Sequence, residues 1–147
     1  MTTLTIREVS RRSGLREPTL RYYEEVGLVG PVARDPSSGH RRYTEDDVDT
    51  LQALACLRAM GVGIEEMRIY QANREWGHQR AAEQRDLLLR HATRVEAEIA
   101  TLHVHLDYLQ MKAALWDARS RGDVDAETLV NEELQELLPR LEKVVMR

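Results

Sequence analysis

The sequence predicts a mainly α-helical fold, with several short helices, one long helix and a short helical tail. Apolar residues within residues 4–75 recur at spacings of three and four, and residues 88–116 carry an apolar stripe that alternates between these spacings. A small β-hairpin is also expected, because residues 35–39 are rich in turn-forming Asp, Pro, Ser and Gly. The basic residues 40–43 that follow are strand-like.

The first two helices are expected close to the N-terminus. Thr5 is a suitable N-cap for a helix over residues 6–13, because its side-chain oxygen can accept a hydrogen bond from a free N–H group of the first turn. Gly14 can adopt the positive φ that ends such a helix. A second short helix is expected over residues 17–25, although Arg16 at its N-cap position cannot accept such a bond.

The second helix has one inward and one outward face. Leu20 and Tyr23 lie three residues apart and can face inward, whereas Arg21 and Tyr22 project outward. A short helix that exposes Arg and Tyr, followed by a hairpin with Arg residues, is typical of the surface that a winged helix-turn-helix presents to DNA. We therefore predict a winged helix-turn-helix head.

Two further helices should complete this head. Residues 44–47 begin like a capping box, and acidic residues in a first turn are favoured by the helix dipole. This helix should end near Gly61, and the next should run from residue 64 to about residue 75. Trp76 and Gly77 then mark a joint.

The clearest periodicity of the chain follows this joint. It is a heptad seam of about four repeats. Such a stripe can be the buried face of a helix in a bundle, but no other long helix is expected here, so a second copy of the chain is the better explanation. The spacing does not distinguish a parallel from an antiparallel pair. The seam consists of Leu88, Ala92, Val95, Ile99, Leu102, Leu106, Leu109, Ala113 and Trp116.

The tail over residues 126–146 is also amphipathic. We expect Pro139 to start a new short helix, because proline is well tolerated in a first turn. An apolar stripe of this strength is unfavourable in water, so the tail should fold back on the coiled coil or on the partner's joint.

Composition limits the class of protein. The chain has 147 residues, one cysteine and a net charge of −4. Residues 1–43 hold eight Arg against five acidic residues, whereas the remainder holds 13 basic and 20 acidic residues. A positive surface for nucleic acid can therefore exist at one end. There is no membrane-spanning run, no signal-peptide pattern and no cysteine pair, so a cytoplasmic location is expected.

Catalytic chemistry is not indicated. The sequence lacks a phosphate-binding glycine loop, a nucleophile elbow and a recognisable pair of catalytic acids, so we do not expect an enzyme. We also expect no metal and no cofactor, because Cys56 is the only cysteine. His103 and His105 are two residues apart, on different flanks of the expected helix.

Three motifs in one order resemble the MerR family of bacterial transcription regulators. They are residues 20–28 (Leu-Arg-Tyr-Tyr-Glu-Glu-x-Gly-Leu), residues 39–43 (Gly-x-Arg-x-Tyr) and the helix over residues 46–61. The resemblance implies a winged helix-turn-helix DNA-binding domain over residues 1–75. It further implies a coiled-coil dimerisation helix over residues 76–120 that pairs antiparallel, and a helical tail over residues 121–147 that packs back on the dimer.

The resemblance also implies a function. A homodimer would bind a pseudo-palindromic operator in a promoter spacer and, in response to an effector, distort the DNA so that RNA polymerase can engage the promoter. Activation in a stress response is the expected role. The alternatives are an effector-independent repressor or architectural DNA-binding protein of the same fold, and a protein-interaction module with a degenerate head. The positions expected to contact DNA are Arg16, Thr19, Arg21, Tyr22, Arg41, Arg42 and Arg58.

Two places are candidates for an effector. Cys56 resembles the lone cysteine of family members that respond to aldehydes or oxidative stress, and the alternative is a small buried core residue. The other candidate is a pocket for an organic ligand, where one subunit's joint meets the partner's coil and tail. Its expected lining, for which the alternative is again ordinary core, is Tyr70, Trp76, Tyr108 and Trp116.

Overall fold

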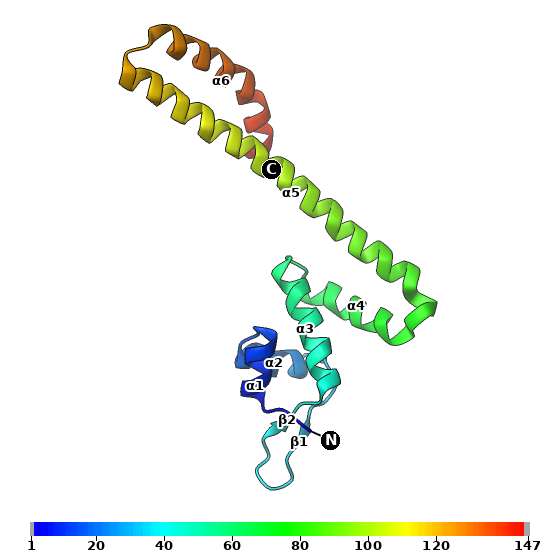
Figure 1. Ribbon diagram of the computed structural model, residues 1–147. Coiled ribbons are helices and arrows are strands. Elements are labelled where there is room, and N and C mark those ends of the chain that lie inside the picture. The colour runs from blue at the N-terminus through cyan, green and yellow to red at the C-terminus, as the bar shows by residue number, and fades with distance from the viewer. Residues whose placement is uncertain (1, 146–147) are drawn as a thin grey trace. The chain divides into compact units, whose positions relative to one another are not determined.

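The computed structural model describes residues 2–145. The chain folds into two compact units, residues 1–87 and 88–147. The first unit contains α1 (Ile6–Ser13), α2 (Glu17–Glu25), β1 (Ala33–Arg34), β2 (Arg41–Arg42), α3 (Glu45–Ala59), α4 (Ile64–Trp76), the 3-10 helix η1 (Gly77–Arg80) and the first residues of α5 (Ala81–Arg121) (Figure 1). The second unit contains the rest of α5 and α6 (Val124–Val145). The predicted fold class, mainly helical with a small wing and a long C-terminal helix, is confirmed.

Side-chain caps fix where α1 and α3 begin. Thr5 Oγ1 accepts a hydrogen bond from the Glu8 N–H group at 3.2 Å, and the Glu8 carboxylate accepts one from the Thr5 N–H group at 3.1 Å. Thr44 and Asp47 form the same reciprocal pair at 3.1 and 2.9 Å. Each capping box satisfies N–H groups that the helix leaves without partners, so both predicted helix starts are confirmed.

The first four helices share one hydrophobic core. Its buried members come from every helix of the head and from the segments that connect them to the hairpin. They are Leu4, Val9, Leu15, Leu20, Tyr23, Leu28, Val32, Tyr43, Val48, Leu51, Leu54, Val62 and Met67. Outside this core, Arg12 and Glu45 join α1 to α3 by two hydrogen bonds of 3.0 Å each. The head is therefore a single packed body from which α2 and the hairpin are presented.

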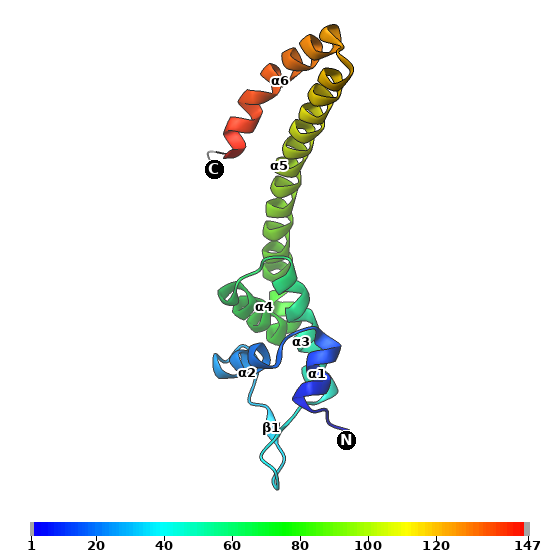
Figure 2. The same ribbon diagram turned by 90° about the vertical axis from the view of Figure 1, so that its left-hand side faces the viewer.

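The hairpin is the wing. β1 and β2 pair antiparallel, with Ala33 opposite Arg42 and Arg34 opposite Arg41. At its base, the backbone groups of Leu4 and Tyr43 exchange hydrogen bonds of 2.8 and 2.9 Å. The loop of the hairpin extends away from the helices of the head (Figure 2).

A hydrogen-bonded pair of amide side chains closes the joint between α4 and α5. The Asn73 side chain is 4% exposed, and its Nδ2 donates to Gln84 Oε1 at 3.2 Å. Gln84 Nε2 donates in turn to the backbone oxygen of Tyr70 at 3.0 Å. α4 ends at Trp76, where Gly77 has a φ of +56°, so the predicted joint at these two residues is confirmed.

In the second unit, the chain reverses direction after α5, and α6 turns back from the C-terminal end of α5 (Figures 1 and 2). Leu115 and Ala118 of α5 are 3% and 1% exposed, and Leu134 and Leu137 of α6 are 5% and 4% exposed. Among the described residues of this unit, 88–145, the only helices are α5 and α6, so these side chains are buried against one another.

The expectation that Pro139 starts a new helix is wrong. α6 is one helix of 22 residues with Pro139 inside it. A proline at this position leaves the carbonyl of Gln135 without its usual N–H donor. The burial of Leu134 and Leu137, on the turns around that carbonyl, offsets this local cost.

The expectation that the chain has no second long helix is therefore also wrong. However, α6 covers a different stripe of α5 from the predicted seam. Leu102, Leu109 and Trp116 of the seam are 62%, 63% and 63% exposed. α5 thus carries two apolar stripes, one buried by α6 and one uncovered within the chain.

Candidate nucleic-acid interface

Three arginine side chains from three elements line one recess of the head. Arg21 comes from α2, Arg34 from β1 and Arg41 from β2, and the recess has a volume of about 160 Å³. The remaining lining residues are Thr5, Ile6, Gly39 and His40. A cluster of guanidinium groups at an open surface suits the phosphate oxygens of nucleic acid, which accept bidentate hydrogen bonds from arginine.

Glu24 of α2 fixes the position of the wing. Its Oε1 accepts a hydrogen bond from Arg41 Nε at 2.8 Å, and its Oε2 accepts one from the Val32 N–H group at 2.7 Å. Arg34 lies 3.9 Å from the same carboxylate. Burial acts to raise the pKa of Glu24, but the hydrogen bonds from Arg41 and Val32 outweigh it, so the pKa lies below its usual value. The carboxylate stays ionised and holds both wing strands against α2.

The wing loop is ordered by Asp35. Its Oδ1 accepts hydrogen bonds from the Ser37 hydroxyl at 2.6 Å and from the N–H groups of Ser37 and Ser38 at 2.9 and 3.1 Å. These bonds hold the pKa of Asp35 well below its usual range. Arg42, a predicted DNA contact, lies 3.5 Å from Asp35 Oδ2, so its guanidinium is directed toward the loop.

The exposed face of α2 carries the predicted recognition residues. Arg21 is exposed, and Tyr22 is 48% exposed, while Leu20 and Tyr23 are buried as predicted. Arg16 is the N-cap and makes no capping hydrogen bond, as expected. The first turn of α2 therefore retains free backbone N–H groups next to an exposed arginine, an arrangement that favours anions.

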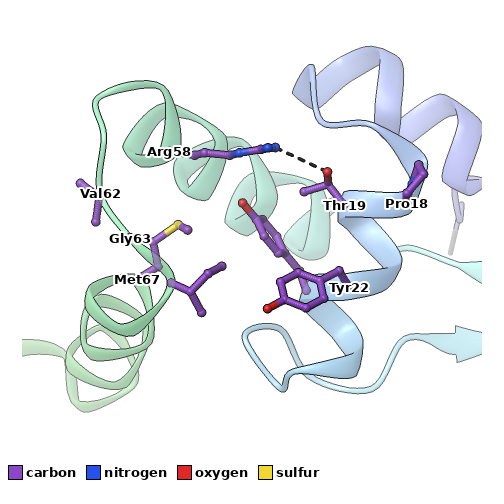
Figure 3. A pocket seen from close by; sticks show the side chains of 9 residues that line it. Pro18, Thr19, Tyr22, Arg58, Val62, Gly63 and Met67 are labelled. Carbon is purple, nitrogen blue, oxygen red and sulfur yellow. Dashed lines mark hydrogen bonds between the residues drawn. The ribbon is translucent and has the colours of Figure 1, made fainter.

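A second cavity lies on the other side of α2, against α3 and the start of α4. Its volume is about 410 Å³. Arg58 at the end of α3 extends to α2, where its Nη1 donates to Thr19 Oγ1 at 3.5 Å (Figure 3). The lining, which contains three of the predicted DNA-contact residues, consists of Pro18, Thr19, Tyr22, Tyr23, Arg58, Val62, Gly63, Ile64 and Met67.

Sequence reasoning missed Arg34. The two-residue strand β1 shows no apolar alternation, so it gave no strand signal. Counting symmetrically about the Asp-Pro-Ser-Ser-Gly turn would have paired Arg34 with His40, one position short of its observed partner Arg41.

The two effector candidates lie in different settings. The Cys56 thiol on α3 is exposed, so within the described chain it is not the buried core residue of the alternative interpretation. Tyr70 and the half-exposed Trp76 belong to the first unit, whereas Tyr108 and the exposed Trp116 belong to the second. The pocket that these four residues were expected to line stays a prediction about the dimer.

The fold and its arginine-lined recess define a class: a helix-turn-helix protein with a wing, the architecture of a DNA-binding domain. Comparison with known proteins gives the family. Residues 4–73 match the model described as "MerR HTH family regulatory protein". The chain is also 30% identical over 128 residues to an uncharacterised HTH-type transcriptional regulator of Haemophilus influenzae, covering 86% of this chain and 94% of the relative.

Two crystal structures resemble the chain over most of its length. One is HiNmlR, described as a MerR family regulator lacking the sensor domain, bound to promoter DNA, with 30% identity, a TM-score of 0.70, and coverage of 86% of this chain and 96% of that one. The other is a putative MerR family transcriptional regulator from Listeria monocytogenes, with 28% identity, a TM-score of 0.69, and coverage of 88% and 98%. This chain belongs to the MerR family and is a DNA-binding transcriptional regulator.

Within residues 2–145 no helix is long and apolar enough to cross a membrane. Over the same residues, no three His, Cys, Asp or Glu side chains are grouped closely enough to hold a metal ion. The relatives named above are transcriptional regulators rather than enzymes.

Proposed function

We propose that the protein binds a pseudo-palindromic operator as a homodimer, with α2 of each subunit in the major groove and the wing on the adjacent backbone. The observation that carries this proposal is the recess that Arg21, Arg34 and Arg41 line. Tyr22 is exposed on the same helix as Arg21. Arg21 and Tyr22 lie on the exposed face of α2, where they can reach base edges or phosphate. Arg34 and Arg41 lie on the wing, where they can neutralise phosphate.

The uncovered seam of α5 supports the homodimer. α6 buries one stripe of α5 and leaves Leu102, Leu109 and Trp116 exposed. A continuous apolar stripe of this length on a soluble chain favours a partner helix with the same heptad pattern. A two-fold axis between identical subunits then requires an operator with two related half-sites. The antiparallel arrangement follows the family.

The second part of the proposal concerns how the bound protein acts on a promoter and which effector triggers it. By analogy with HiNmlR, which is bound to promoter DNA, the operator lies in a promoter and the bound dimer distorts it for RNA polymerase. The exposed Cys56 supports a response to thiol-reactive electrophiles, because an accessible thiol can be modified without unfolding the head. The alternative is that an organic effector binds in the pocket predicted for the dimer, with Tyr70, Trp76, Tyr108 and Trp116 as its lining.

A second candidate function is regulation without an effector. HiNmlR is described as lacking the sensor domain, and this chain matches 96% of that chain. An effector-independent repressor or architectural protein of the same fold would use the same DNA surface. It would give the same transcription level with and without electrophile.

Transcription in vitro tests this proposal. An operator is first selected from random duplex DNA and placed in a promoter spacer. Transcription is then measured with and without a thiol-reactive aldehyde, for the wild type and for Cys56→Ser. A response of the wild type alone supports Cys56 as the sensor. Equal transcription under all conditions, with DNA binding retained, would exclude Cys56 as the sensor and leave the effector-independent alternative and the predicted aromatic pocket. Failure to select any duplex would contradict DNA binding itself.

A further inference from the structure

The cavity between α2 and the turn from α3 to α4, here called the head cavity, has a lining that DNA binding does not explain. Its apolar lining residues come from both sides, Pro18 from α2 and Val62, Ile64 and Met67 from the turn after α3 and the start of α4. A phosphate group of the DNA backbone needs donors and positive charge, not an apolar lining. The volume of about 410 Å³ lies within the range of small-molecule sites.

A buried hydroxyl without a partner lies in this lining. Tyr23 is 2% exposed, and among residues 2–145 its Oη has no hydrogen-bond partner. Burial raises the pKa of Tyr23, and the positive charge of the nearby Arg58 guanidinium opposes this rise. A buried donor without an acceptor costs roughly 1–3 kcal/mol. A ligand that supplies an acceptor would recover part of this cost.

Two further features favour a negatively charged acceptor. The hydrogen bond from Arg58 to Thr19 is long, at 3.5 Å, and a guanidinium carries five N–H donors, so Arg58 can also donate to a ligand. Gly63, another lining residue, is the N-cap of α4 and has no side chain to accept from the first turn. The helix dipole favours an anion there. Glu65 in that turn does not fill the cavity, because its side chain is 89% exposed and pairs with Arg68.

We propose that the head cavity binds a small organic anion. Its carboxylate would accept hydrogen bonds from the Tyr23 hydroxyl and from Arg58, and its flat apolar body would contact Val62, Ile64 and Met67. Thr19, Tyr22 and Arg58 belong both to this cavity and to the proposed DNA surface. An occupied cavity would therefore change the affinity of the head for DNA. The binding step itself does not depend on the proposed function.

Methyl NMR tests the site directly, without DNA. The chain has five methionines, and Met67 lines the cavity while Met111 lies on α5. The full chain carrying ¹³C-methyl methionine is titrated with 1-naphthoate, with its neutral analogue 1-naphthylmethanol and with inorganic phosphate. We expect 1-naphthoate to shift the Met67 signal in a saturable manner and to leave Met111 unchanged. The neutral analogue should bind at least tenfold more weakly, and phosphate should not shift Met67 at the same concentrations.

Two tyrosine variants provide a matched comparison. Tyr23 and Tyr43 are both buried with unpartnered hydroxyls, but Tyr43 lines a different cavity. Tyr23→Phe should weaken 1-naphthoate binding about fivefold, as expected for one hydrogen bond, and Tyr43→Phe should change it less than twofold. Arg58→Gln should weaken it at least tenfold. Four results would each overturn the proposal. They are a Met67 signal that 1-naphthoate does not shift, equal binding of the neutral analogue, a comparable shift with phosphate, and equal effects of the two tyrosine variants.

Discussion

Arg41 Nε donates a hydrogen bond of 2.8 Å to Oε1 of Glu24, and this contact joins the wing to α2. Arg41 is 21% exposed and Glu24 15% exposed at the side chain, so the pair is largely shielded from water. Arg41 was predicted only as a DNA contact. In the structure, the guanidinium of Arg41 lines the recess and also fixes β2 against α2. The orientation of the wing therefore depends on one carboxylate.

Replacing that carboxylate should loosen the wing. In Glu24→Gln the amide can still accept from Val32 but cannot form an ion pair with Arg41, so we expect a loss of about 2 kcal/mol in unfolding free energy, as for a hydrogen bond to a charged group. Urea unfolding measures this loss. Glu25→Gln is the matched control, because Glu25 is the exposed neighbour on α2 and should change stability by less than about 0.5 kcal/mol. Equal effects of the two variants would contradict the role of Glu24.

The same carboxylate predicts a dependence on pH. The pKa of Glu24 in the folded head lies below its usual value of 4.5. A depressed folded pKa contributes stability above the unfolded pKa, and this contribution is lost as the pH falls through the folded value. The difference in Tm between wild type and Glu24→Gln should therefore be constant near neutral pH and shrink below about pH 4.5. A Tm difference that grows as the pH falls would contradict the lowered pKa assigned to Glu24.

The amide pair at the joint gives a further prediction. Gln84→Ala removes both hydrogen bonds that close α4 against α5 and leaves the Asn73 amide buried without a partner. We expect a loss of about 1–3 kcal/mol in unfolding free energy and faster amide hydrogen exchange around Tyr70 to Trp76. Gln79→Ala, at an exposed glutamine of η1, is the control. Unchanged exchange in Gln84→Ala would show that the pair does not hold the joint.

A charge in the uncovered stripe of α5 should abolish the dimer. Leu102 is 62% exposed and lies in the seam, while Leu129 is 57% exposed and lies on α6 outside it. Sedimentation should therefore give a dimer for the wild type and for Leu129→Asp, and a monomer for Leu102→Asp, because a buried unpaired charge at the interface is strongly unfavourable. A dimeric Leu102→Asp would place the interface elsewhere.

Local chemistry made much of the head predictable. The bounds of α1 and α2 followed from Thr5, Gly14 and the helical spacing of Leu20 and Tyr23, because caps and periodicity act within a few residues. The joint at Trp76 followed in the same way. Contacts between distant segments were not predictable from such signals.

The stripe of α5 that α6 buries shows why contacts between distant segments were not predictable. Leu115 and Ala118 lie on a helix face adjacent to the seam, and only the return of α6 distinguishes that face as the one buried within the chain. The Asn73–Gln84 pair was missed for a related reason, since polar residues eleven positions apart meet only once the joint has formed. Arg34 was missed because a two-residue strand carries no periodic pattern.

The measurement that tests DNA binding through α2 and the wing most directly is the salt dependence of operator affinity for Arg21→Ala. Arg21 is exposed, so the variant should fold normally. On a selected duplex, the variant should bind more weakly than the wild type by over about 1 kcal/mol, and its slope of log affinity against log salt should fall by about 1 if Arg21 contacts phosphate. Arg85→Ala, on the exposed surface of α5, should bind like the wild type. Unchanged affinity of Arg21→Ala, or wild-type binding that does not respond to salt, would contradict the assignment of α2 as the recognition helix.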